Sequence, residues 1–532
     1  MNDKEKEEKE DGQVIPSPDW SLCSNSDKNL SSSGLCLSVI ASFLVFKETH
    51  IPIILVAQPT NCDSILQNSF YDQILFKEES LHDIRRGGFT SVWLPPVCKS
   101  VQWQGYLPGG LYDIDSFYGS LTQLQRLVKL LKEHGLQVWI DWPVKRRCLR
   151  EQDPSHRNHM YVTKPIWTVD CLESSSSMKN NAATCNVGYH PKLLMSTNME
   201  DWLDMTIPVH LHNPKVRQDL IQWTKWLSNQ LGMDGLVCDG VESSDVPFLL
   251  DWIEHSTEEE ISSRHSSSNR FPSDVVSPQS SSSRKNNRNT PHSSFISIAL
   301  VKVECSVDSQ GRLAYDQTWA TDRLMEFIES TNNHFALVDT VTRAILEAAV
   351  VFHEYWRLID KEARVVGLLG RRSDRAITTL NMVDLLATPD DKEPKHIFGE
   401  HGYYLHPAST CAASNHSHSW RICKTQRYVF PEQHILKGYA YLLTHPGIPC
   451  VHWDHYFDAR WRQSIEELIR VRKGCHIHAS SSVYIESACS EYYAAFIDNR
   501  VAVKIGRGDW HPSGPDWKLY TCGWEYAVWK RT

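Results

Sequence analysis

Short apolar segments alternate with helix-like segments along most of this chain, and that alternation limits the folds open to it. Helix-like segments lie at 77–86, 121–135, 212–232 and 245–256, and apolar residues recur at helical spacing in 121–135. Segments typical of buried strands lie between and beyond them, at 52–58, 89–96, 136–144, 235–240, 295–303, 334–339, 376–383 and 447–453. Strands separated by helices in this number predict a closed parallel (β/α)₈ TIM barrel.

The pattern changes near residue 475, where five short strand-like segments follow one another without helices. They predict an antiparallel β-sheet domain over 475–532, after a barrel over 51–474. Three stretches interrupt the barrel pattern: a loop excursion at 145–211, a Ser-rich insertion at 256–294 and a second insertion at 385–425. The composition of 256–294, and of a leader at 1–50, predicts disorder because neither can bury a core.

Charge and cysteine usage narrow the function classes. A net charge of −9 gives no reason to expect a nucleic-acid partner. The apolar run at 34–46 is too short to span a membrane, so no membrane partner is expected. The acidic start MNDKEKEEKEDG is unlike a signal or transit peptide, and the 15 scattered cysteines suit a reducing compartment. We therefore expect a cytoplasmic location.

Three long motifs carry a resemblance to a known family. They are GFTSVWLPPVCKSVQWQGYLPGGLYDIDSFYG at 88–119, KGYAYLLTHPGIPCVHWDHYFD at 437–458, and the final run from VYIES to YAVWK. With them the chain resembles the plant α-amylases, which are retaining α-glucan hydrolases. The resemblance runs from about residue 51 to residue 532, apart from the insertions at 256–294 and 385–425, and implies an enzyme of starch metabolism.

The resemblance marks several positions of that reaction as kept. Retaining glycosidases need a nucleophilic carboxylate and a carboxylic acid about 5 Å apart. Asp239, in GMDGLVCD, matches the nucleophile, and Asp384 matches a third acid that stabilises the transition state. Tyr106 matches a tyrosine that stacks on the sugar, or it packs the barrel rim within a retained structural motif.

Other positions of the reaction are changed. Val237 stands where the resemblance implies an arginine beside the nucleophile, and Glu242 stands where it implies a lysine. The fifth strand, ISIALVKVECS, puts Val301 or Lys302 at the place of the general acid. Glu304 is a candidate substitute acid, although a shift of three residues from Val301 changes the face of a strand.

The sugar-binding and metal-binding positions also differ. Val383 and Arg146 replace two histidines that bind sugar hydroxyls in the family. Lys145 replaces an asparagine that is a calcium ligand, and 209–211 reads VHL where the family has I-D-H. A cation at a ligand position repels calcium. We therefore expect no metal and no other cofactor.

Three functions remain open from the sequence. The first is a pseudoenzyme that binds α-glucan or a protein partner without cleaving glucan. The second is an active α-glucan endohydrolase that uses Asp239, Asp384 and Glu304. The third is a regulatory scaffold in which the 256–294 segment docks protein partners and responds to phosphorylation. The alternative for that segment is an insertion without a function, since surface loops tolerate insertions.

Overall fold

The computed structural model describes most of the chain that the strand pattern covers. The described residues are 51–57, 70–71, 74, 78–100, 105–106, 108–148, 151–152, 159–160, 165–167, 171, 206–255, 297–309, 312–381 and 430–532. The predicted leader and the two insertions at 256–294 and 385–425 lie outside these residues, as does much of the 145–211 excursion.

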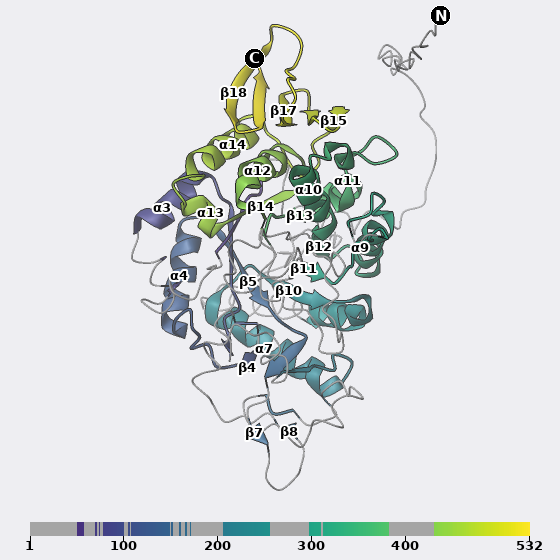
Figure 1. The fold of residues 1–532 in the computed structure, drawn as a ribbon. Helices are drawn as coiled ribbons and strands as arrows, with labels where there is room; N and C mark the ends of the chain where they lie inside the picture. The colour runs from purple at the N-terminus through teal and green to yellow at the C-terminus, as the bar shows by residue number, and fades with distance from the viewer. Residues whose placement is uncertain are drawn as a thin grey trace, which may run out of the picture. The chain divides into compact units, whose positions relative to one another are not determined.

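Eight parallel strands close into a barrel, as the sequence predicts (Figure 1). Going around the barrel, their order is β1, β14, β13, β12, β11, β10, β5 and β2. Their bounds are β1 Ile54–Val56, β2 Ser91–Leu94, β5 Gln137–Trp142, β10 Gly235–Val241, β11 Ser297–Val301, β12 Phe335–Val338, β13 Ala376–Thr378 and β14 Ile448–His452. Each lies within or overlaps one of the eight predicted segments.

Helices follow the strands along the chain. The longer ones are α3 Glu78–Gly87, α4 Leu121–Glu133, α7 Pro214–Leu231, a helix over 246–255, α9 Thr318–Ser330, α10 Thr340–Phe352, α12 Ile435–Thr444 and α14 Arg462–Gly474. Asn213 caps α7 by accepting hydrogen bonds from the amides of Lys215 and Val216. His134 caps the carboxyl-terminal end of α4, and Gly135 follows it with a φ of 71°.

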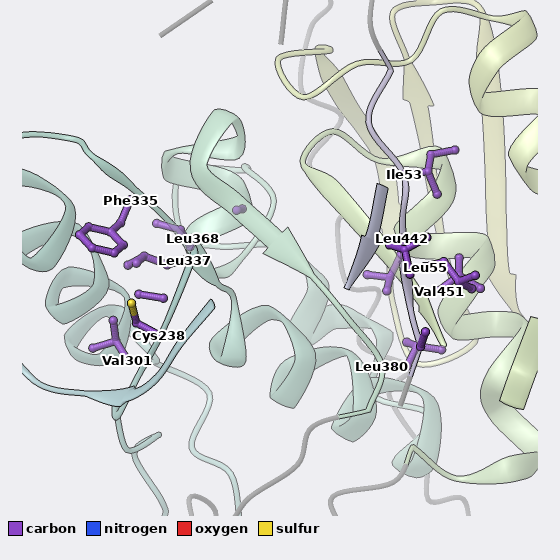
Figure 2. Packing of buried hydrophobic residues seen from close by; sticks show 14 of the residues in the cluster. Ile53, Leu55, Cys238, Val301, Phe335, Leu337, Leu368, Leu380, Leu442 and Val451 are labelled. Atoms are coloured by element: carbon purple, nitrogen blue, oxygen red, sulfur yellow. The ribbon is translucent and has the colours of Figure 1, made fainter. Parts of the chain in front are cut away.

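Residue alternation along the strands separates two apolar clusters. One fills the barrel interior and contains Ile54, Val56, Trp93, Trp139, Val237, Ile298, Ala336, Val338, Ile377, Ile448 and Cys450. The alternate residues point outward and pack against the helices, among them Leu55, Cys238, Val301, Leu337 and Val451 (Figure 2). Interior-facing positions can therefore be read from strand register alone.

The C-terminal sheet has five antiparallel strands in the order β15, β16, β17, β19 and β18. They span β15 Val483–Ala488, β16 Tyr492–Ile497, β17 Val501–Gly506, β18 Trp517–Gly523 and β19 Tyr526–Arg531, as the sequence predicts. One face, with Tyr493, Ala495, Val503 and Val528, belongs to the same apolar cluster as the barrel helices. The sheet is thus packed directly onto barrel elements, α12 and α14 among them (Figure 1).

Small antiparallel pairs lie in the loops that follow the second and third barrel strands. They are β3 Lys99–Ser100 with β4 Pro108–Gly110, β6 Arg146–Cys148 with β9 Thr206–Pro208, and β7 Glu151–Gln152 with β8 His159–Met160. None of the helices in the described part of the chain is long and apolar enough to cross a membrane.

Candidate active site

The candidate site lies at the carboxyl-terminal end of the barrel strands, which we call the mouth of the barrel. Barrels of this type carry their functional groups at that end. Two carboxylates lie there on interior-facing positions: Asp141 on β5, two residues after Trp139, and Asp239 on β10, two residues after Val237. The strands hold both at the inner surface because alternate residues share a face.

Asp239, the predicted nucleophile, is only 6% exposed. It is in register with Leu300 of β11, and a register shift follows it between Asp239 and Val241. Gly240, between these two, has a φ of 70°, a conformation that glycine adopts without steric cost. The irregularity ends regular pairing immediately beyond the carboxylate, at the rim of the barrel.

Asp141 was not predicted as a site residue, yet it is a buried carboxylate of the mouth with a hydrogen bond to Tyr106. It is 4% exposed, and its Oδ2 accepts a hydrogen bond of 2.5 Å from the hydroxyl of Tyr106. The signal was present in the sequence, because the alternation of QVWIDW puts Asp141 on the face of Trp139. Asp141 is not among the positions that the resemblance to the α-amylases marks.

Tyr106, the predicted sugar-stacking residue, is 5% exposed and joins these carboxylates. Burial raises the pKa of its phenol well above the usual value, and the negative charges of Asp141 and Asp239 raise it further. The same three causes raise the pKa of the Cys238 thiol. The structure therefore brings Tyr106, Asp141 and Asp239 together in one anionic, largely dry environment.

Val237 lies in register with Asp141 and is fully buried in the interior cluster. The position for which the resemblance implies an arginine therefore contributes only apolar surface below the two carboxylates. Glu242 directly follows β10 and is half-buried, and its amide donates to Oδ2 of Asp245 at 2.8 Å.

The two alternatives for the general-acid position have different surroundings. Val301 packs outward, in the cluster between barrel and helices (Figure 2). Lys302, the residue after the end of β11, is half-buried, and its amide donates to the carbonyl of Val241 at 3.0 Å. The alternation of Ile298 and Leu300 predicts that Lys302 faces inward, and which of the two residues occupies the general-acid position stays a prediction.

Glu304, the predicted substitute acid, lies three residues beyond the last residue of β11 and is exposed. Regular alternation no longer applies there, so strand register does not place its carboxylate in the mouth. Asp384 and Val383, the predicted residues of the seventh strand, lie outside the described residues. Their roles stay predictions.

His452 also lies at the mouth and was not predicted. It ends β14, on the interior face of Ile448 and Cys450. The amide of Asn381 donates to His452 Nε2 at 3.3 Å, and the Thr379 hydroxyl lies 2.8 Å from the same nitrogen. Burial lowers the pKa of His452 well below its usual value, and the nearby His455 lowers it further. The ring is thus held neutral beside the segment that leads toward 384.

Lys145 lies at the predicted calcium position, just past β5. Its Nζ donates to both carboxylate oxygens of Asp245, at 3.0 and 2.9 Å, and the two side chains are 15% and 4% exposed. The carbonyl of Lys145 accepts from the amide of Val209, the first residue of the VHL triplet, at 2.8 Å. An ion pair between side chains thus joins the loops that follow β5 and β10.

In the described part of the chain, no three or more His, Cys, Asp or Glu side chains gather into a group that could hold a metal ion. The backbone of Arg146 lies in β6, but its side chain is outside the description. Its predicted replacement of a sugar-binding histidine stays a prediction.

Comparison with known proteins gives consistent relatives. Residues 474–530 match the family model of the α-amylase C-terminal β-sheet domain. The chain is 28% identical over 455 residues to a probable α-amylase 2 of Arabidopsis thaliana, covering 84% of this chain and 88% of that one. It is 25% identical over 480 residues to the chloroplastic α-amylase 3 of the same plant, of which it spans 44%.

A solved structure agrees with the fold. The crystal structure of an Anoxybacillus α-amylase matches with a TM-score of 0.51 at 13% identity, covering 91% of this chain and 98% of that one. At this identity the likeness concerns the architecture of barrel and sheet. An α-amylase type B isozyme of Hordeum vulgare is 39% identical over 106 residues, which cover 19% of this chain and 68% of that one. With the C-terminal domain match and the two Arabidopsis relatives, this identity shows that the chain belongs to the α-amylase family of glycoside hydrolases.

Proposed function

We propose that this protein binds α-glucan at the mouth of the barrel and does not cleave it. What supports the proposal is the residue that follows β11, Lys302, which the alternation of Ile298 and Leu300 assigns to the interior face while Val301 packs outward. A lysine at neutral pH is an ammonium with no carboxyl proton to give to a glycosidic oxygen, whereas retaining hydrolysis needs a carboxylic acid opposite the nucleophile.

A second observation supports the same proposal. The two carboxylates Asp141 and Asp239 are buried above the fully apolar Val237. A cation beside the nucleophile would favour its ionised form, and Val237 supplies none at the position where the resemblance implies an arginine. Hydroxyl-rich ligands suit such a site, since buried carboxylates and the Tyr106 phenol offer hydrogen bonds to sugar hydroxyls.

The proposal includes independence from calcium. The ammonium of Lys145 supplies a positive charge between the loops after β5 and β10, paired to Asp245. A divalent cation bound at this position would be repelled by that ammonium. A cytoplasmic location is also part of the proposal, although one Arabidopsis relative carries the word chloroplastic in its name.

Calorimetry with maltoheptaose beside a soluble-starch hydrolysis assay tests the proposal. Binding without turnover is expected, with affinity reduced at least about tenfold in Asp141→Asn, since a hydrogen bond to a charged group contributes about 1.5–3 kcal/mol. Asp516→Asn, on the C-terminal sheet and exposed, is the matched control and should bind normally. Starch hydrolysis that disappears in Asp239→Asn would overturn the proposal.

The second candidate is a weakened α-glucan hydrolase that uses Asp239, Asp384 and Glu304. The burial of Asp239 at a strand end favours it, because that is where a nucleophile of this family lies. If turnover is found, Glu304→Gln separates the two: a loss of about 10²–10⁴-fold would assign the acid to Glu304. The third candidate, a scaffold that acts through 256–294, predicts that deletion of that segment abolishes protein capture.

A further inference from the structure

Two histidines join the barrel helices to the C-terminal sheet, and each does so through a ring nitrogen that carries no proton. His445 follows α12 and is fully buried. Its Nδ1 lies 2.9 Å from the carbonyl oxygen of Tyr441 and its Nε2 lies 2.9 Å from the hydroxyl of Tyr493 on β16. A carbonyl can only accept, so Nδ1 carries the proton and Nε2 accepts from Tyr493.

His353, at the end of α10, repeats this arrangement on a second strand. Its Nε2 lies 2.9 Å from Nη2 of Arg507, which follows β17. A guanidinium can only donate, so this Nε2 is also unprotonated. A second proton on His353 would fall on the nitrogen that Arg507 holds, and would break that contact.

The surroundings of His353 hold two cations, Lys437 and Arg507, and two carboxylates, Glu525 and Glu491. Glu525, in the turn between β18 and β19, accepts from Nζ of Lys437 at 2.6 Å and from Nε of Arg507 at 2.9 Å. Lys437 is 1% exposed and lies on α12, and His434 adds a further ring beside Lys437 and Glu525. Glu525 is thus already paired with both cations, and the cation nearest in contact with the His353 ring is Arg507.

The surroundings of His445 are equally unable to take a charge. The groups that face it are the ring of Tyr441 on α12, Tyr493 on β16 and the guanidinium of Arg472 on α14. Arg472 is fully buried and donates to the carbonyl oxygen of His445 at 2.5 Å. No carboxylate faces His445 among the described residues that these contacts identify.

We propose that His353 and His445 make the junction between the barrel and the C-terminal sheet acid-sensitive, so that the sheet is held firmly near neutral pH and loosens when these rings take up protons. Protonation of His353 breaks its hydrogen bond with Arg507, because neither nitrogen can then accept. Protonation of His445 reverses its bond to Tyr493, whose hydroxyl must then accept, and places a cation beside the buried Arg472. The junction also contains the Lys437–Glu525 ion pair, but the two histidines are its groups with an ordinary pKa between pH 5 and pH 8.

The directions of the pKa shifts agree with this geometry. Burial lowers the pKa of His445 to about 3, and the charge of Arg472 lowers it further. Burial and then Arg507 lower the pKa of His353. A histidine freed from the junction regains an ordinary pKa of about 6.5. The loosened state therefore binds more protons below about pH 6.5, and the firm state loses population as pH falls, by up to about tenfold per pH unit for each histidine.

Hydrogen–deuterium exchange of the whole protein tests the proposal, with each rate corrected for the intrinsic effect of pH. Protection of the β16 and β17 amides should fall at least about tenfold more than that of β12 between pH 7 and pH 4.5. In His353→Gln the fall should be smaller, because a glutamine carbonyl accepts from Arg507 at every pH. In His445→Gln it should be smaller still.

The control is His511→Gln, an exposed histidine of the sheet that faces solvent, and it should behave like the unaltered protein. If His445→Gln does not fold, the half-buried His353→Gln still decides the outcome. Equal loss of protection in β12, β16 and β17 would overturn the proposal, and so would an unchanged acid response in His353→Gln.

Discussion

The hydroxyl of Tyr106 donates to Oδ2 of Asp141 over 2.5 Å, and both side chains are buried at the mouth of the barrel. The bond ties the loop after β2 to the end of β5. It also fixes the direction of the phenol, whose raised pKa keeps it protonated over the whole physiological range. Asp141 is thereby a hydrogen-bond acceptor held in one orientation.

Tyr106→Phe removes that donor from a buried carboxylate. We expect the free energy of unfolding at pH 7 to fall by about 1.5–3 kcal/mol, the usual contribution of a hydrogen bond to a charged group. Urea unfolding followed by circular dichroism measures it. Tyr520→Phe, at an exposed tyrosine of β18, is the control and should change stability little. Equal stabilities of the two variants would contradict the expected role of the Tyr106–Asp141 bond.

Lys302→Glu places a carboxyl group on the interior face next to β10. If the missing acid limits the reaction, this variant should gain slow starch hydrolysis, and the gain should vanish in the double variant with Asp239→Asn. General acid–base catalysis contributes about 10²–10⁴-fold, so the gain should be visible over long incubations. Lys302→Gln removes the ammonium without adding an acid and should stay without turnover. Starch hydrolysis by Lys302→Gln would contradict the role of the added carboxyl group as the acid.

Lys145→Met leaves Asp245 nearly buried without its ammonium partner. Removing one member of a buried ion pair costs about 3 kcal/mol or more, because the remaining charge stays desolvated. Thermal unfolding should show this loss, and added EDTA should leave the melting temperature of the unaltered protein where it is. Lys361→Met, which removes the partner of exposed Asp316, is the control and should cost less. A melting temperature that drops with EDTA would argue for a bound metal.

Gly367→Ala should be far more costly than Gly232→Ala, although both glycines have a left-handed φ, 69° and 64°. A Cβ atom on Gly367 would lie 2.2 Å from Oγ1 of Thr342, whereas nothing lies within 4 Å of one on Gly232. Gly232→Ala should cost about 1–2 kcal/mol for its backbone alone. Gly367→Ala adds a steric clash where Thr342 bonds the Asp339 carboxylate. Similar unfolding free energies would contradict this.

The architecture could be predicted because it depends on local periodicity. Each of the eight barrel strands and five sheet strands has an apolar pattern that reads correctly over a few residues. The register shift after Asp239 could not be predicted in the same way. It lies in the pairing of β10 with β11, and a single sequence contains no direct signal for the pairing of two strands.

The resemblance marks only part of the candidate site. Asp239 and Tyr106 both lie at the mouth, and their roles in the reaction stay predictions. Asp141 and His452 are not marked by the resemblance, although the alternation along β5 and β14 places both on interior-facing positions.

The closure of the barrel has a consequence for how the chain folds. Strand β1 pairs with β2 along the sequence but also with β14, where Ile54 meets Cys450. Contacts between such distant segments form late, because a long loop must close first. During synthesis β1 therefore has an open edge until β14 has left the ribosome. A product truncated before residue 448 would keep the edge of β1 unpaired. Copies of that product would tend to aggregate by pairing along this edge.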